Sequence, residues 1–204
     1  MIERGRLFII SGPSGVGKDT ILNKFLPMSS NCKRAITATT RTPRLGEVHG
    51  AHYYFYSREE FLQMAENGEL LEYTEYNGNL YGPPKKGVEE IQNSGKNVIL
   101  EIEVHGGLKV KKMYPESVLV FIVAPSWKVL EQRLRDRGTE SEQDIQTRLK
   151  NARFELSKAH EYNYIIINDV LERCCERLGA VISAAGCEER HMKSFIESLR
   201  LPPL

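Results

Sequence analysis

A glycine-rich turn between an apolar run and an amphipathic segment constrains this chain more than any other feature. Residues 7–10 are apolar and predict a buried parallel strand, and Gly12 to Lys18 then follow the pattern Gly-x-x-x-x-Gly-Lys. The glycines let successive backbone N–H groups converge on one anion, and the helix that begins near Lys18 adds the positive end of its dipole. The turn therefore predicts a phosphate-binding loop formed by Gly12, Pro13, Ser14, Gly15, Val16, Gly17, Lys18, Asp19 and Thr20.

Runs typical of strands alternate with segments of helical spacing over most of the chain. The clearest strand-type runs are residues 97–103, 117–124 and 164–168. Helices are expected between them, including a short one after Gly107, and an acidic loop is expected over 139–144. Strands that alternate with helices in this way predict an α/β fold with a doubly wound parallel sheet.

Residues 37–86 interrupt this alternation, and residues 41–50 within them are polar, basic and turn-prone. A helix is expected to open at Ser57, because Glu60 three residues later completes a capping box. The segment therefore predicts a small, mostly β lobe inserted into the larger domain. The strands expected in and just before it are residues 34–40, 53–56 and 70–76.

The overall charge and the cysteines argue against several classes of function. The 204 residues include 28 basic and 27 acidic ones, so a net charge of +1 gives no global attraction to nucleic acid or to an anionic membrane. We expect no signal peptide in the polar residues 1–6, and no apolar run is long enough to span a bilayer. The four cysteines lack metal-site spacing, which favours reduced thiols in a cytoplasmic protein.

Several motifs together resemble those of guanylate kinases, along nearly the full chain. They lie at residues 12–18, 39–50, 81–82, 101–103, 133–140 and 167–169. The second motif, Thr-Thr-Arg-Thr-Pro-Arg followed by Gly-Glu-x-x-Gly, is highly specific. The resemblance implies a P-loop nucleoside monophosphate kinase that transfers the γ-phosphate of ATP to GMP, or to dGMP, with Mg²⁺ as cofactor. It also implies a core of residues 1–36, 87–133 and 153–204, a GMP-binding lobe of residues 37–86, and a helical lid of residues 134–152.

The resemblance also implies which residues bind GMP. Two loop arginines beside the rigid Pro43 can fork onto the dianionic phosphate of the nucleotide. Carboxylates can accept from the N1–H and the N2 amine of guanine, and adenine has neither donor, so such a site would reject it. The implied GMP contacts are Thr37, Arg41, Arg44, Tyr53, Glu72, Tyr81 and Glu103.

Phosphoryl transfer depends on positioning and on charge neutralisation more than on covalent help. The residues implied to act on the transferring group are Lys18, Arg41, Arg133, Arg137 and Arg148, and Asn168 is implied near the adenine of ATP. No motif marks a direct metal site. Mg²⁺ is therefore expected to be held through the nucleotide, with Asp19 and Thr20 as the candidates for a ligand from the protein.

Three positions depart from the pattern of the family. Asp19 replaces a hydroxyl residue, Pro83 replaces a Ser or Thr that donates to guanine O6, and His105 replaces a Gln. One alternative is a guanylate-kinase-like binding module without catalysis, and another is a kinase for a different small phosphate ester. The lysine of the phosphate loop and the paired carboxylates favour the GMP kinase, as a monomer or homodimer without nucleic-acid or membrane partners.

Overall fold

The computed structural model describes residues 4–76, 78–136 and 141–199. The larger of its two sheets is parallel throughout and has the strand order β2-β7-β1-β8-β9. Its strands are β1 (Leu7–Ser11), β2 (Cys32–Arg34), β7 (Asn97–Glu101), β8 (Val118–Val123) and β9 (Tyr164–Ile167). The chain runs from β1 to β2 at one edge and later crosses from β7 to β8 on the other side of β1. The turn after β1 therefore lies at the switch point of the topology, where ligands bind in open α/β sheets.

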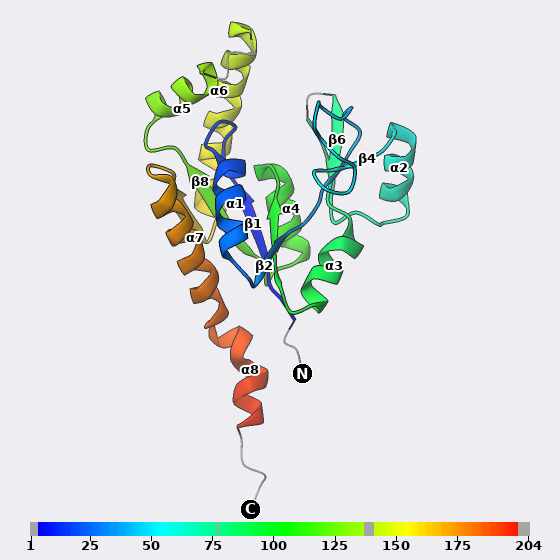
Figure 1. Cartoon of the computed structure of the whole chain (residues 1–204), viewed down its shortest axis with the longest axis vertical. Coiled ribbons are helices and arrows are strands. Elements are labelled where there is room, and N and C mark those ends of the chain that lie inside the picture. Colours follow the sequence, from blue (N-terminus) through cyan, green and yellow to red (C-terminus); the bar gives the residue numbers. More distant parts are fainter. Residues whose placement is uncertain (1–3, 77, 137–140, 200–204) are drawn as a thin grey trace, which may run out of the picture.

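Helices cover both faces of this sheet (Figure 1). Helices α1 (Lys18–Phe25) and α7 (Leu171–Gly186) pack on one face, and α3 (Lys85–Asn93) and α4 (Val104–Met113) pack on the other. Side chains along β1 alternate between the two apolar clusters, and every residue of the strand is buried. The predicted doubly wound α/β fold is therefore confirmed.

A second, smaller sheet stands beside the first and has the order β4-β3-β6-β5. It is mixed, because β3 pairs with β4 in parallel and with β6 antiparallel, while β5 and β6 form an antiparallel hairpin. Phe61 on the covering helix packs with Leu70 and Leu80 in a separate apolar cluster. The elements of this lobe are β3 (Ala38–Thr39), β4 (Tyr54–Phe55), α2 (Arg58–Glu66), β5 (Thr74–Tyr76) and β6 (Asn79–Gly82).

The predicted single strand over 34–40 is wrong. Strand β2 ends at Arg34 in the large sheet, and β3 begins at Ala38 in the small one. Ala35 still donates its N–H to the carbonyl of Ile99 at 2.9 Å, after which the chain crosses between the sheets. The strand expected over 70–76 is also shorter, because β5 begins at Thr74. Propensity cannot reveal which sheet a β-prone residue joins, since partners far along the chain decide it.

The arginine-rich region after β8 forms two helices, α5 (Trp127–Arg135) and α6 (Glu142–Ser157). The prediction of an acidic loop over 139–144 is wrong at its C-terminal end, because Ser141 and Asp144 form a capping box that starts α6. Residues 137–140, which include the predicted catalytic Arg137, lie outside the described residues. The remaining elements are α8 (Glu189–Ser198) and two 3-10 turns at Leu26–Met28 and Ala159–Glu161.

Two features of the structure bear on the environment expected for the chain. Across residues 4–76, 78–136 and 141–199, no helix combines the length and the apolar character needed to cross a bilayer. Cys32, Cys174, Cys175 and Cys187 are all free thiols.

The packing of α1 yields a stability prediction. Leu22 is 0% exposed inside the cluster beneath α1, so Leu22→Ala should lower the free energy of unfolding by about 2–5 kcal/mol. Leu62 on α2 is 38% exposed, and Leu62→Ala should therefore cost less than about 1 kcal/mol. Urea unfolding measures both. Equal losses from the two variants would contradict the assignment of the core.

Candidate active site

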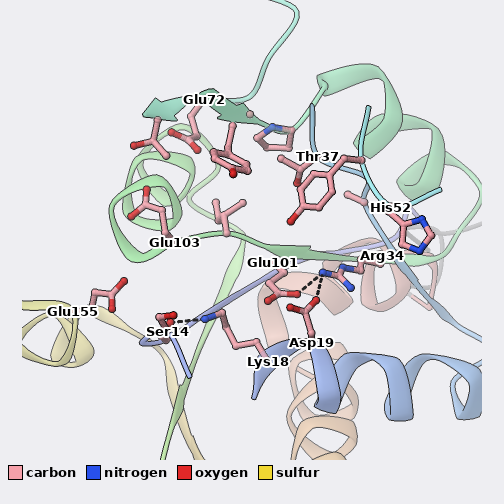
Figure 2. Close-up of a pocket in the computed structure, with 18 of the residues that line it drawn as sticks. Ser14, Lys18, Asp19, Arg34, Thr37, His52, Glu72, Glu101, Glu103 and Glu155 are labelled. Carbon is pink, nitrogen blue, oxygen red and sulfur yellow. Dashed lines mark hydrogen bonds and ion pairs between the residues drawn. The ribbon is translucent and has the colours of Figure 1, made fainter. Parts of the chain in front are cut away.

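A cavity of about 320 Å³ lies between the phosphate loop and the small sheet (Figure 2). Its floor comes from the carboxyl ends of the large sheet, namely the turn after β1 and the ends of β2 and β7. Its other walls come from β5, β6 and helix α6. Parallel strands bring their carboxyl ends to one edge, which explains why residues distant in sequence meet here.

The phosphate loop wraps the N-terminus of α1. Gly17 caps the helix with φ of 91°, in the left-handed region that favours glycine, and a Cβ there would lie 2.7 Å from Nδ2 of Asn168. The Nζ of Lys18 donates to the carbonyl oxygens of Gly12 at 2.6 Å and Pro13 at 3.3 Å. The lysine is therefore folded over the loop, with its ammonium beside the space that the loop encloses.

Side chains from two other elements hold the backbone of this loop. Asn168, which follows β9, donates Nδ2 to the carbonyl of Val16 at 2.7 Å. Arg133 on α5 donates to the same carbonyl at 3.3 Å and to the carbonyl of Asn168 at 3.0 Å. These two predicted site residues thus meet at the loop, where they fix the orientation of its peptide groups.

Helix α6 also contacts the phosphate loop. Arg148 donates to Oγ of Ser14 at 2.7 Å, and both residues line the cavity. Glu155 lies on the same helix seven residues later and therefore on the same face, which is the sequence signal that could have marked it. Burial raises the pKa of Glu155 to about 7, with Lys18 acting to lower it and Glu103 to raise it.

The two predicted phosphate-binding arginines are in different situations. Arg44 lines the main cavity and also an adjoining hollow of about 800 Å³, whereas Arg41 lines only the adjoining hollow. Nη2 of Arg41 donates to both carboxylate oxygens of Glu47, at 2.8 and 2.9 Å, and the guanidinium lies 5.4 Å from the ring centroid of Tyr53. A phosphate bound by Arg41 would therefore have to compete with Glu47.

The tyrosines predicted to bind the same phosphate lie together. The rings of Tyr53 and Tyr81 are 6.2 Å apart at 71°, and both line the cavity with Thr37. Burial raises the pKa of the Tyr53 hydroxyl, so it remains a neutral donor at physiological pH. The three residues form a polar wall of the cavity.

Glu72 presents a buried and unsatisfied carboxylate to the cavity. Its side chain is 4% exposed, and in the part of the chain that the structure describes its Oε2 has no hydrogen-bond partner. Lys109 Nζ lies 3.8 Å from that oxygen. Burial raises the pKa of Glu72 to about 7, Lys109 partly offsets this, and Glu103 adds to it. A Cβ on Gly106 would lie 2.5 Å from Oε1, so any other residue there would force the carboxylate to shift from this position.

Glu103, the second predicted guanine acceptor, has backbone partners already. Its carboxylate caps α4 by accepting from the amides of His105, at 2.6 Å, and Gly106. The cap starts the helix at Val104, so the predictions of a strand to 103 and a helix after Gly107 are wrong. Glu103 lines the cavity near Glu72, but of these two carboxylates only Glu72 has a buried oxygen, Oε2, that lacks a hydrogen-bond donor in the described part of the chain.

Sequence reasoning missed a three-residue charge cluster on the cavity floor. Arg34, the last residue of β2, donates to Oδ1 of Asp19 at 2.8 Å and to Oε2 of Glu101 at 2.6 Å. Glu101 ends the buried strand β7 with a side chain only 12% exposed. A charge at the end of a buried strand was the available signal, and it applied to Arg34 and Glu101 as much as to Glu103.

The residues present offer little to a metal ion by themselves. No group of three or more His, Cys, Asp or Glu among residues 4–76, 78–136 and 141–199 is arranged to hold one. Both candidate ligands are exposed on α1, and Asp19 also lines the cavity and pairs with Arg34. This donor set fits Mg²⁺ only when a nucleotide supplies most of the oxygens.

The sequence and the fold both have counterparts among known proteins. The sequence model of the guanylate kinase family matches residues 4–185. The chain is 46% identical over 185 residues to a guanylate kinase of Desulfitobacterium hafniense (strain Y51), covering 91% of this chain and 92% of that protein. It is 44% identical over 196 residues to one of Shouchella clausii (strain KSM-K16), covering 96% of each. The chain belongs to the guanylate kinase family.

A solved guanylate kinase shares the fold as well. The crystal structure of the enzyme from Anaplasma phagocytophilum matches with a TM-score of 0.79 at 33% identity, covering 98% of this chain and 97% of that one. The resemblance to guanylate kinases is thus confirmed. All three departures from the pattern of the family lie at or beside the cavity: Asp19 and Pro83 line it, and His105 lies in the first turn of α4, which Glu103 caps.

The buried carboxylate of this guanylate kinase family member yields a prediction on stability. Because the folded pKa of Glu72 lies near 7, above its ordinary 4.5, the native chain binds more protons than the unfolded chain between these values. Glu72 therefore lowers the free energy of unfolding as pH rises through this window. Glu72→Gln should match the wild type near pH 5 and exceed its stability by about 2 kcal/mol near pH 8.

Urea unfolding at both pH values measures the difference. Glu75→Gln is the matched control, because Glu75 lies in the adjacent strand with a side chain 54% exposed. That variant should show no gain at the higher pH. An equal gain in both variants would mean that global charge, and not the burial of Glu72, sets the effect.

Proposed function

We propose that this protein transfers the γ-phosphoryl group of ATP to GMP, giving ADP and GDP, and that it acts more weakly on dGMP. The observation that carries the proposal is the cavity itself, which joins a phosphate loop carrying Lys18 to a wall carrying the unsatisfied carboxylate of Glu72. One end suits a nucleoside triphosphate, and the other suits a base with hydrogen-bond donors.

Guanine fits the Glu72 wall by its pattern of donors. Its N1–H and N2 amine are adjacent donors, and an ionised carboxylate can accept from both. The carboxylate of Glu72 accepts hydrogen bonds from these donors, and Oε2 is one of the accepting atoms. Glu103 lines the same cavity, and its carboxylate can accept a further hydrogen bond from the base. Adenine presents an acceptor at N1 and would leave Glu72 unpaired, a discrimination of roughly 10⁴ or more in comparable polar sites.

The phosphate of GMP binds between the base wall and the phosphate loop. Arg44, Tyr53 and Tyr81 supply donors from the cavity side. Arg41 joins them when it exchanges its pair with Glu47 for the phosphate. Thr37 is a further donor on the same wall, which compensates in part for the hydroxyl that Pro83 lacks.

The transfer itself needs alignment and neutralisation of charge. An oxygen of the GMP phosphate attacks the γ-phosphorus in line, and the bond from that phosphorus to the β–γ bridging oxygen breaks. Lys18 neutralises the outer phosphates of ATP, and Arg148 approaches the transferring group from α6. Arg133 and Asn168 keep the loop peptides oriented through the carbonyl of Val16, and Arg137 is proposed as a further lid arginine.

Mg²⁺ is the proposed cofactor and enters with ATP. When bound, it neutralises charge on the β- and γ-phosphate oxygens. Asp19 and Thr20 are the two proposed candidates for a ligand from the protein, with the phosphates and water supplying most of the oxygens. With GMP placed at the small sheet and ATP at the phosphate loop, we also propose that the chain divides into a core, a GMP-binding lobe of 37–86 and a lid of 134–152.

The same reasoning favours catalysis over the alternatives. A non-catalytic binding module has no use for a complete phosphate loop with its lysine, and a kinase for a phosphorylated sugar has no use for the buried Glu72. The free thiols support a cytoplasmic location. The proposed role of the enzyme is in purine nucleotide metabolism, where it recycles GMP. It is proposed to act as a monomer or homodimer.

A panel of acceptors tests this function directly. The purified protein with Mg²⁺ and ATP should form ADP when GMP is added, more slowly with dGMP, and at least about 10³-fold less efficiently with AMP, CMP, UMP or dTMP. A coupled assay of ADP follows each reaction. Equal turnover of AMP and GMP would overturn the assigned specificity, and no turnover with any acceptor would favour the binding module.

The placement of Arg44 yields a separate kinetic prediction. Removing a charge-assisted contact to the GMP phosphate should raise the KM for GMP by about 10- to 100-fold in Arg44→Ala, with the KM for ATP nearly unchanged. Arg58→Ala is the control, because Arg58 is a lobe arginine whose side chain is 53% exposed and pairs with Glu75. If the KM for ATP rose instead, the assignment of the lobe to GMP would be wrong.

A further inference from the structure

An arginine that the proposed reaction does not use joins two carboxylates at the phosphate loop. Arg34 leaves the end of β2 and bridges Asp19, in the first turn of α1, to Glu101 at the end of β7. Figure 2 shows the three side chains meeting on the cavity floor, with Lys18 beside them. The exposed fraction of the side chain is 72% for Asp19, 32% for Arg34 and 12% for Glu101, so solvent screens the Asp19 side of the cluster more than the Glu101 side.

The location of Asp19 creates an electrostatic problem. The N-terminus of α1 attracts anions because its amides and its dipole point there, and Lys18 adds a full positive charge. Asp19 is a fixed anion at this same helix end, and Glu101 places a second one on the floor of the same cavity. Two carboxylates close to a site for a highly charged triphosphate would weaken its binding by like-charge repulsion.

Arg34 balances these charges. The four formal charges at this corner cancel, with two positive and two negative residues: Lys18, Arg34, Asp19 and Glu101. Burial disfavours a charged Arg34, but Glu101 and Asp19 outweigh it and raise the pKa of the guanidinium, so it stays protonated. A planar guanidinium can donate to two carboxylates at once, which the single ammonium of a lysine does less well.

We propose that Arg34 is a positioning residue for ATP binding, which holds Asp19 in an ion pair and so keeps its negative charge from repelling the nucleotide phosphates. The proposal rests on ATP being the phosphoryl donor. In this arrangement Arg34 acts through Asp19, and the affinity of the loop for a triphosphate depends on the pair and not on either residue alone.

A double-mutant cycle tests this coupling without measuring turnover. Binding of an ATP analogue with an imido group at the β–γ bridge is measured by calorimetry without GMP. The wild type is measured with Mg²⁺ to establish binding, and the cycle itself is measured without Mg²⁺, so that a metal contact of Asp19 does not enter the comparison. Arg34→Met should weaken binding by about tenfold, because Asp19 loses its partner. Asp19→Asn alone should change the affinity by less than about threefold, and Arg34→Met with Asp19→Asn should recover to within about threefold of the wild type.

Lys33→Met is the matched control, because it removes the same charge from the preceding residue of β2, whose side chain points to the other face of the sheet and is exposed. It should change the affinity by less than about twofold. The loss in Arg34→Met should also shrink as ionic strength rises from about 50 mM to about 500 mM, since repulsion is screened.

A second variant covers a failure of Arg34→Met to fold. Arg34→Lys keeps the charge and should weaken binding by a few-fold, with the same recovery from Asp19→Asn. An unchanged affinity in the Arg34 variants, or a loss that Asp19→Asn does not recover, would overturn the proposal and leave the proposed function intact. Failure of the wild type to bind the analogue would overturn both.

Discussion

The rest of the site depends on how the phosphate loop is fixed at the carboxyl edge of the large sheet. The carbonyl of Val16 accepts from Asn168 at 2.7 Å and from Arg133 at 3.3 Å, and Arg148 contacts Ser14 from α6. These partners lie more than a hundred residues further along the chain, so the loop takes its shape only when the sheet and its helices are assembled. A loop held in this way does not have to reorganise when it binds phosphates, which is the kind of preorganisation that phosphoryl transfer requires.

The same cavity holds carboxylates at a cost to stability. Glu72 and Glu155 both have pKa values raised to about 7 by burial, which means that ionising them in the folded protein is unfavourable. A polar ligand that donates to Glu72 would offset the cost, so the site exchanges some stability of the free protein for selectivity toward that ligand.

Charge balance on the cavity floor shows why single residues are a poor guide to such a site. Taken alone, Asp19 is only a departure from the usual phosphate loop, and Arg34 is only a charged residue at the end of a strand. Their contact at 2.8 Å, with Glu101 2.6 Å from the same guanidinium, makes the three residues one electrostatic unit. Sequence reasoning found the first member and not the others, because pairing across β2, α1 and β7 is a property of the assembled sheet.

The sequence by itself determined the family, the doubly wound fold and the position of the phosphate loop, because each follows from local patterns. The Gly-x-x-x-x-Gly-Lys turn after a buried strand and the capping box at Ser57 both act over a few residues. Only the tertiary structure decided where 34–40 divides between two sheets, that Glu103 caps α4, and that Oε2 of Glu72 has no hydrogen-bond donor among the described residues. These outcomes depend on burial and on partners far along the chain, and no local pattern specifies either of them.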